Sequence, residues 1–418
     1  MNGWMSRVGG LILAAGLSAS AFAQTPTTDW PQFLGPHRDG ISSETGLLDA
    51  WPAQGPKQVW RVEGGVGMSG LAIVGDQLVT MLQRDGQQRV VALDSRTGQR
   101  RWETPVAPEY KNSMGNGPRA TPTIHGERVF AFTGEGILVA LQRADGKILW
   151  KHHVLEELGG KEADYGMASS PLVVGSVVVV LAGSDRGTLA AYDLATGKLA
   201  WTSGQSPVSY SSPTLLTIEK TPMIVAAAGA AIEGFDPATG RLLWSYPYAT
   251  DFQCNIAVPL AAAGGLFVSA GENHGSAYLR LRRSGEKYEV EEVWTSFGPK
   301  SVLRNEWQTS IQSQGYLFGL DNVGGAGPIT HLACVELATG KRVWQQTRFG
   351  KSNLIMADGK LFFSTMQGEL VIVKADPKSY QELGRATVTG PTRQAPALSR
   401  GHLYLRDDAE IVCLDVRK

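Results

Sequence analysis

The densest group of reactive side chains lies between residues 304 and 308. A cation, two amides, a carboxylate and an indole follow one another here, as Arg304, Asn305, Glu306, Trp307 and Gln308. A guanidinium can bind an anion, an indole can stack on a flat ring, and the amides can orient either ligand. The alternative interpretation is an ordinary solvated loop.

Similar side chains precede several other strand-like segments, close to a Ser-Pro or Thr-Pro step or its equivalent. They are rich in amides, hydroxyls, aromatic rings and arginines. If these segments are equivalent repeats, their side chains form one ring around a ligand site, although capping of ordinary loops would require the same residue types. The predicted ring consists of Asn116, Arg119, Tyr165, Ser169, Tyr210, Asn255, Arg304, Glu306, Trp307, Gln308, Asn353, Arg393 and Gln394.

The familiar catalytic and metal-binding spacings are missing from the sequence. No C-x-x-C, H-E-x-x-H or G-x-S-x-G occurs, so no metal site and no catalytic residue is predicted. Glu306 is the prominent acid of the ring, whereas glycoside hydrolysis normally uses two carboxylates. Cys334 and Cys413 stand where other repeats have Ala or Gly, which favours a buried packing role over a metal or redox role.

The elements that position these residues are indicated by a repeated pattern, A-x-D-x-x-T-G-x-x-x-W. Each copy predicts a strand, a turn opened by Asp and completed by Gly, and a second strand that carries Trp. One indole per repeat can bury on the order of 200 Å² and join neighbouring sheets. The predicted docking residues are Trp60, Trp102, Trp150, Trp201, Trp244, Trp294 and Trp344, of which Trp294 ends a degenerate copy.

The spacing of the repeats predicts an all-β fold, an eight-bladed β-propeller with four-stranded antiparallel blades. Successive Trp residues from Trp102 to Trp344 are 43 to 51 residues apart, which fits four short strands and their turns. The last unit, Cys413–Asp415, ends before its Trp strand, while Pro56–Trp60 is a Trp strand without a preceding turn. We therefore expect the N-terminal strand to complete the last blade, and the predicted ring to line one mouth of the central channel.

Composition agrees with a protein of many strands and tight turns. The 418 residues include 50 Gly and 21 Pro, and only 19% are charged. The formal net charge is zero and no run of Lys or Arg occurs, which argues against a nucleic-acid partner.

Residues 1–23 have the features of a secretory signal peptide. Arg7 precedes the apolar stretch Val8–Leu17, and Ala21-Phe22-Ala23 is a suitable cleavage site without a neighbouring lipobox cysteine. No later stretch is long and apolar enough to be a transmembrane segment after signal removal. We expect a periplasmic or secreted protein, with residues 24–55 as an extension that either wraps the propeller or stays loose, and residues 56–418 as the propeller.

The repeated unit resembles the tryptophan-docking motif of the quinoprotein alcohol dehydrogenase-like superfamily, whose members are built from PQQ-like propeller repeats. The segment Trp30–Pro36 also looks like the opening of many secreted proteins with such repeats. The resemblance implies docking tryptophans around the outside of eight blades. It also implies one of two functions: an enzyme that holds pyrroloquinoline quinone (PQQ) with Ca²⁺ in the channel, or a BamB-like scaffold without a catalytic role.

The enzymes of this superfamily typically carry adjacent cysteines beside PQQ, and Glu, Asn and Asp oxygens on Ca²⁺. This sequence has no Cys-Cys pair, and no such oxygen set can be assigned. We therefore favour a non-catalytic binding or interaction scaffold of the cell envelope, with an envelope protein or a small exported ligand as partner and no cofactor firmly implied. A PQQ-dependent dehydrogenase that oxidises an alcohol or sugar is the alternative.

Overall fold

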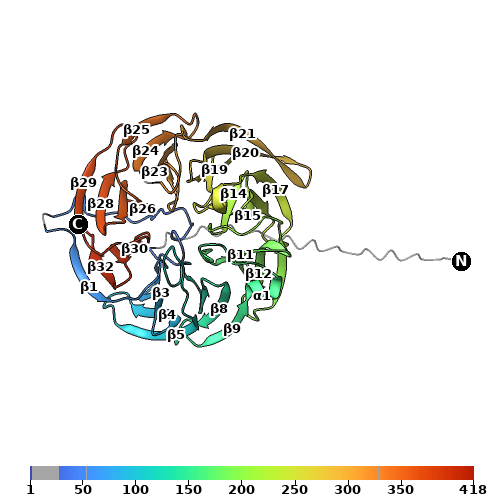
Figure 1. Cartoon of the computed structure of the whole chain (residues 1–418), viewed down its shortest axis with the longest axis horizontal. Coiled ribbons are helices and arrows are strands. Elements are labelled where there is room, and N and C mark those ends of the chain that lie inside the picture. Colours follow the sequence, from blue (N-terminus) through green and yellow to red (C-terminus); the bar gives the residue numbers. More distant parts are fainter. Residues whose placement is uncertain (2–27, 53, 328) are drawn as a thin grey trace.

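The computed structural model describes residues 1, 28–52, 54–327 and 329–418. The predicted signal peptide, apart from Met1, lies outside these ranges. Within them the chain forms eight four-stranded sheets arranged in a ring around a central axis (Figure 1). All strand pairs within the sheets are antiparallel, for example β3 with β4 and β11 with β12, so the predicted fold class is confirmed.

The blades follow one another along the chain, from the inner to the outer strand. Blade 1 has β2 (Ala72–Val74), β3 (Gln77–Arg84), β4 (Gln87–Asp94) and β5 (Arg100–Pro108); blade 2 has β6 (Thr123–His125), β7 (Arg128–Phe132), β8 (Ile137–Gln142) and β9 (Ile148–His153). Blade 3 has β10 (Leu172–Val174), β11 (Val177–Ser184), β12 (Gly187–Asp193) and β13 (Leu199–Ser203); blade 4 has β14 (Thr214–Ile218), β15 (Thr221–Ala227), β16 (Ala231–Phe235) and β17 (Leu242–Pro247). Blade 5 has β18 (Leu260–Ala262), β19 (Gly265–Ala270), β20 (Gly275–Ser284) and β21 (Lys287–Phe297); blade 6 has β22 (Ile311–Ser313), β23 (Tyr316–Val323), β24 (Ile329–Glu336) and β25 (Arg342–Gln346). Blade 7 has β26 (Ser352–Ala357), β27 (Lys360–Thr365), β28 (Glu369–Lys374) and β29 (Glu382–Thr387); blade 8 has β30 (Ala397–Ser399), β31 (His402–Arg406), β32 (Glu410–Asp415) and β1 (Lys57–Glu63). Two short helices, α1 (Val154–Leu158) and η1 (Asp251–Gln253), lie in connections between blades.

The two ends of the propeller share blade 8. Strand β1 pairs antiparallel with β32, and Trp60 lies opposite Cys413. The expected closure by the N-terminal strand is therefore confirmed. It covers the outer edge of β32, which would otherwise expose unpaired backbone groups.

The middle strands are apolar because each blade is covered on both faces by its neighbours. In β11, every residue from Val177 to Ala182 is buried. One hydrophobic cluster includes Val91 of blade 1, Leu405 of blade 8 and Ile355 of blade 7, so the core lies between blades rather than within one sheet.

The tryptophans of the outer strands contact the turn of the following blade. The indole N–H groups of Trp60, Trp102, Trp150, Trp294 and Trp344 donate to the backbone carbonyls of Ser95, Arg143, Leu194, Leu337 and Asp376, respectively. These bonds run from blade to blade, in the manner expected of docking residues. Trp201 packs against Gly240 of the next blade, but its buried indole N–H has no hydrogen-bond partner within the described ranges.

Trp244 departs from this pattern. Its indole N–H donates to Sδ of Met223 at 3.2 Å, within its own blade. The following repeat is the degenerate one, where the Thr-Gly turn is replaced by the long hairpin of β20 and β21 around Gly285. The predicted inter-blade turn contact is therefore absent at Trp244, although its ring shares a hydrophobic cluster with Leu266 of blade 5.

Hydroxyl side chains connect the inner strands around the axis. Oγ1 of Thr121 accepts the N–H of Gly70 at 3.2 Å, and Oγ of Ser170 accepts the N–H of Thr121 at 2.9 Å. Oγ of Ser212 in turn accepts the N–H of Ser170 at 2.9 Å. Since inner strands of different blades share no ladder hydrogen bonds, these side chains satisfy backbone donors that would otherwise be unpaired.

The N-terminal segment 28–52 is ordered against the propeller and crosses the middle of the ring, where it appears as a blue strand of chain (Figure 1). Trp30 bridges to Ile73, and Ile41 bridges to Met356. Both partners lie towards the ends of inner strands, β2 and β26, whereas the predicted ring lies where inner strands begin. The segment therefore covers the mouth of the channel opposite to the ring.

Candidate functional site

A blind pocket of about 190 Å³ lies on the propeller axis. Its walls come from the connections that lead from each outer strand into the next inner strand, and its floor is formed by the N-terminal segment. The lining residues are Trp30, Phe33, Leu34, Met68, Gly70, Leu71, Met114, Arg119, Thr121, Tyr165, Ala168, Ser170, Tyr210, Ser212, Ile256, Trp307, Asn353, Arg393, Gln394, Ala395 and Pro396.

Seven residues of the predicted ring meet in this pocket, although they come from six different connections. They are Arg119, Tyr165, Tyr210, Trp307, Asn353, Arg393 and Gln394. Several are held by backbone groups of neighbouring connections: the Asn353 amide donates to the carbonyl of Arg393 at 2.7 Å, and the Gln394 amide donates to the carbonyl of Gly67 at 2.7 Å. These bonds leave the apolar faces of the lining side chains directed at the cavity.

Two tyrosines form a stacked pair in the pocket wall. The ring centroids of Tyr165 and Tyr210 are 5.5 Å apart, with an interplanar angle of 28°. The Tyr210 hydroxyl accepts the backbone N–H of Tyr165 at 3.2 Å, and burial raises the pKa of Tyr210. The hydroxyl thus stays protonated at neutral pH, and the pair acts as a flat, uncharged surface.

Trp307 stands between two cations. The Lys351 ammonium lies 4.3 Å and the Arg393 guanidinium 5.0 Å from the centre of an indole ring. Both distances are within the range of cation–π attraction. Arg393 also donates to the carbonyl of Met114 at 2.5 Å, which fixes its head group at the rim of the pocket.

Arg119 is held by carbonyls alone. Its guanidinium donates to the backbone oxygens of Tyr165, Gly117 and Gly115 at 2.5 to 2.7 Å, and lies 4.7 Å from the centre of the Tyr110 ring. Desolvation lowers the pKa of Arg119. The group remains charged at neutral pH, so it places a positive charge in the wall of the pocket.

The floor contains a second cation beneath the apolar surface of Trp30, Phe33 and Leu34. Arg38 is only 2% exposed and donates to the carbonyls of Ser170 and Pro213 at 3.1 and 2.8 Å, and also to that of Pro171. Burial lowers the pKa of Arg38 to about 9. This arginine fastens the N-terminal segment to the inner strands of blades 3 and 4.

Six residues of the predicted ring lie outside the pocket lining. Asn116 is exposed and accepts the backbone N–H of Asn112, while Ser169 accepts the N–H of Leu181. The Asn255 amide donates to Ala228 O and Tyr248 O, and the Gln308 amide donates to Leu320 O. These four side chains cap backbone groups, as the alternative interpretation of the ring had it.

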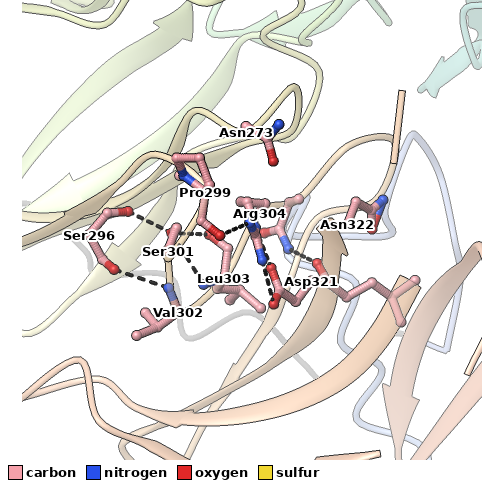
Figure 2. A network of polar contacts seen from close by, with 12 residues as sticks. Asn273, Ser296, Pro299, Ser301, Val302, Leu303, Arg304, Asp321 and Asn322 are labelled. Atoms are coloured by element: carbon pink, nitrogen blue, oxygen red, sulfur yellow. Dashed lines mark hydrogen bonds and ion pairs between the residues drawn. The ribbon is translucent and has the colours of Figure 1, made fainter. Parts of the chain in front are cut away.

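Arg304 and Glu306 are occupied by ion pairs. Figure 2 shows the Arg304 guanidinium between the Pro299 carbonyl and Asp321, with N–O distances of 2.7 and 3.0 Å to the carboxylate. Arg304 and Asp321 are 3% and 1% exposed. Glu306 pairs with Lys351 at 2.9 Å and accepts the Asn322 amide at 2.9 Å. The structure therefore places both charges of the segment 304–308 behind the pocket wall, and leaves Trp307 as its contribution to the lining.

The floor of the pocket was not part of the predicted ring. Trp30, Phe33 and Leu34 belong to the motif that resembles the opening of related secreted proteins, but the sequence did not indicate where that motif docks. Met114 and Ile256 were also missed, because apolar residues in long connections carry no periodic signal.

The lining fits a flat organic anion better than it fits Ca²⁺. Two arginines, an indole and a tyrosine pair converge on the pocket, but none of its described lining residues is an Asp or Glu. Ca²⁺ requires six to eight oxygen ligands, of which carboxylates are the usual core. No group of three or more His, Cys, Asp or Glu suited to a metal occurs in the described part of the chain.

The three cysteines are buried free thiols. Burial raises the pKa of Cys254 to about 11, and that of Cys334 and Cys413 to about 12. Cys334 and Cys413 are fully buried members of two hydrophobic clusters. All three are thus protonated packing residues at neutral pH.

The fold and the pocket define a closed eight-bladed propeller with docking tryptophans and a binding cavity on its axis. A family model described as outer membrane protein assembly factor BamB matches residues 41–138, 86–346 and 332–418, and the chain belongs to this family. Within the described ranges, neither helix has the length and apolar character needed to cross a bilayer.

Known relatives fall into two groups. The outer membrane protein assembly factor BamB of Shewanella oneidensis is 21% identical over 314 residues, which is 72% of this chain and 77% of that protein. The quinohemoprotein alcohol dehydrogenase ADH IIB of Pseudomonas putida is 30% identical over 144 residues, 32% of this chain but only 20% of the enzyme. The crystal structure of the quinohemoprotein alcohol dehydrogenase from Comamonas testosteroni superimposes with a TM-score of 0.67 at 14% identity, and covers 94% of this chain and 81% of the enzyme. At that identity the structural match establishes the fold alone.

Proposed function

We propose that this protein is a non-catalytic binding module of the cell envelope, which holds its ligand or partner in the blind axial pocket. The observation that carries the proposal is the lining of that pocket. It combines aromatic faces, methionine side chains and arginine head groups, which serve recognition, and its described members include no carboxylate that could act as a base. The similarity to assembly factors of the outer membrane supports an exported scaffold.

The rim of the pocket supports contact with a molecule that enters from outside. Met114 lines the cavity and is 36% exposed, so it is available both to solvent and to a bound molecule. A flexible thioether at an open rim adapts to ligands of different shape.

Site-specific photo-crosslinking in the native envelope tests the proposal. A photoreactive residue replaces Met114 at the rim, or Leu149 on the outer strand β9, which is 42% exposed and serves as the matched control. We expect adducts from position 114 and none of the same mass from position 149. Equal adducts at both positions, or none at position 114, would contradict binding in the pocket.

A PQQ-dependent dehydrogenase is the second candidate function. It is favoured by the placement of Arg119, Trp307 and Arg393 in the channel and by the partial similarity to quinohemoprotein alcohol dehydrogenases. PQQ would supply the two-electron oxidation of an alcohol or sugar, and these three side chains would hold its carboxylates and rings. The lining provides no carboxylate for the Ca²⁺ that accompanies it.

The two candidates are separated by an activity assay on the purified mature protein. The protein is incubated with PQQ and Ca²⁺, and dye-linked oxidation of a panel of alcohols and sugars is measured beside an active quinoprotein dehydrogenase. We expect no turnover above the rate of free PQQ. Saturable turnover by the protein would overturn the non-catalytic proposal.

A further inference from the structure

The pocket has more positive charge than its surroundings neutralise. Arg119 and Arg393 line the wall, and Arg38 lies beneath the floor. Among the described residues none of these three forms an ion pair within 4.0 Å, whereas Lys351 is paired with Glu306. Glu162, the acid that influences Arg119, is itself bonded to the Tyr110 hydroxyl. Charges that converge on a low-dielectric cavity without counter-ions favour an anion there.

The shape of the lining selects for a flat molecule. Trp307 and the Tyr165–Tyr210 pair provide aromatic surfaces, and Arg393 lies at the edge of Trp307 where it can reach a group stacked on the indole. The floor of Trp30, Phe33 and Leu34 closes the far end, so a chain cannot thread through. A cavity of about 190 Å³ with one entrance is suited to a small molecule rather than to a folded partner.

The same lining supplies no carboxylate oxygen for a metal. In the enzymes that the family resembles, an organic anion in the channel is accompanied by Ca²⁺, and this chain lacks the corresponding donors. An anion must therefore be held by arginine and aromatic groups alone.

We propose that the pocket binds a small, flat aromatic carboxylate without a metal ion. This inference rests on the proposed binding function and names its ligand class. The carboxylate lies against Arg393 and Arg119, and the ring stacks on Trp307 or on the tyrosine pair. Binding weakens with ionic strength because the attraction is between full charges.

Isothermal titration of the full mature chain tests the ligand class. The probe is 2,6-naphthalenedicarboxylate in EDTA, and 2,6-naphthalenedimethanol serves as its neutral counterpart. We expect one probe per chain in EDTA, no gain on adding Ca²⁺, and at least about tenfold weaker binding of the diol, since a charge-assisted pair is lost. Binding that needs Ca²⁺, equal binding of the diol, or no saturable binding of the dicarboxylate would overturn the inference.

Matched variants locate the site. Arg393→Gln is expected to weaken binding about tenfold, and Arg393→Lys to retain most of it because the charge remains. Arg186→Gln is the control, since Arg186 is exposed on the same face and lies outside the lining. An unchanged melting temperature shows that Arg393→Gln is folded, and unaltered affinity in that folded variant would contradict the site.

The outcomes remain distinguishable from those of the proposed function. Turnover with PQQ would overturn the non-catalytic role but not the preference for anions. Loss of probe binding together with rim-specific crosslinks would overturn the ligand class and leave the binding function in place.

Discussion

The indole N–H of Trp60 donates a hydrogen bond of 2.9 Å to the backbone carbonyl of Ser95. Trp60 belongs to the outer strand of blade 8, and Ser95 belongs to the turn of blade 1. This bond, together with the β1–β32 pairing, joins the last blade to the first. The same contact recurs between most neighbouring blades, so ring closure uses the interaction that also builds the rest of the ring.

Gly98 of that turn packs directly on the indole, and its substitution is expected to weaken the ring. A Cβ at Gly98 would lie 2.9 Å from Trp60 Cε3, at a φ of +74°. Gly98→Ala should cost about 1 kcal/mol for the backbone conformation and a further 1 to 3 kcal/mol for the overlap. Urea unfolding measures the difference. The control is Gly175→Ala, where φ is +57° and a Cβ meets nothing within 4 Å. Equal destabilisation of both variants would contradict the packing argument.

Arg38 is expected to hold the N-terminal segment over the channel. Arg38→Met leaves the carbonyls of Ser170 and Pro213 buried without their donor, and each unmet group costs about 1 to 3 kcal/mol. We expect faster proteolysis and hydrogen exchange of residues 28–49, while the blades remain protected. The neighbouring exposed residue provides the control, His37→Ala. Unchanged protection of the segment in Arg38→Met would show that other contacts suffice to hold it.

The Asp94 turn is expected to lose stability in acid. Burial acts to raise the pKa of Asp94, but hydrogen bonds from Arg101, Arg96 and Thr97 outweigh it and lower the pKa to about 2. A folded pKa below the unfolded value of 3.8 means that the carboxylate stabilises the fold above pH 4, and that this contribution disappears as pH falls towards 2.

Asp94→Asn removes that titration. Urea unfolding of both proteins between pH 5 and pH 2 should show a difference on the order of 1 kcal/mol at pH 5, after allowance for solvent screening, which shrinks towards pH 2. A difference independent of pH would mean that the charge of Asp94 does not stabilise the turn.

Asp321 is expected to be a structural residue of blade 6. Asp321→Asn leaves the Arg304 guanidinium buried beside a neutral partner, which typically costs about 3 to 5 kcal/mol. The double variant Arg304→Met/Asp321→Leu should recover much of this loss, because neither charge of the pair remains and Arg342 can reach solvent. Thermal unfolding of the three proteins provides the comparison. A double variant as unstable as Asp321→Asn would indicate that the pair contributes more than mutual neutralisation. The exposed pair Asp415–Arg417 offers a control, since Asp415→Asn should change stability little.

Trp60 and Trp244 show how far a local pattern carries. Both precede or end a clear repeat, and the sequence predicts docking for both. Trp60 meets the turn at Ser95, but Trp244 turns to Met223 of its own blade, because the next repeat has a hairpin in place of the Thr-Gly turn. The pattern of one repeat therefore predicts its own strands well, while the contact of its indole depends on the repeat that follows.

Arg304 and Arg393 make the same point for the pocket. Both precede an inner strand and both were expected at the channel mouth. Arg393 lines the cavity, whereas Arg304 turns away because Asp321, 17 residues later on β23, offers it a buried carboxylate.

The repeated Trp, Gly and Asp positions determined the class of fold, the number of blades and the closure by the N-terminal strand. These features follow from strands and turns that adjacent residues specify through hydrophobic pattern and backbone conformation. The tertiary structure alone decided that residues 28–52 close one mouth, and which arginines face the cavity. Those outcomes depend on contacts between residues hundreds of positions apart, such as Arg38 with Pro213, and local sequence carries no record of them.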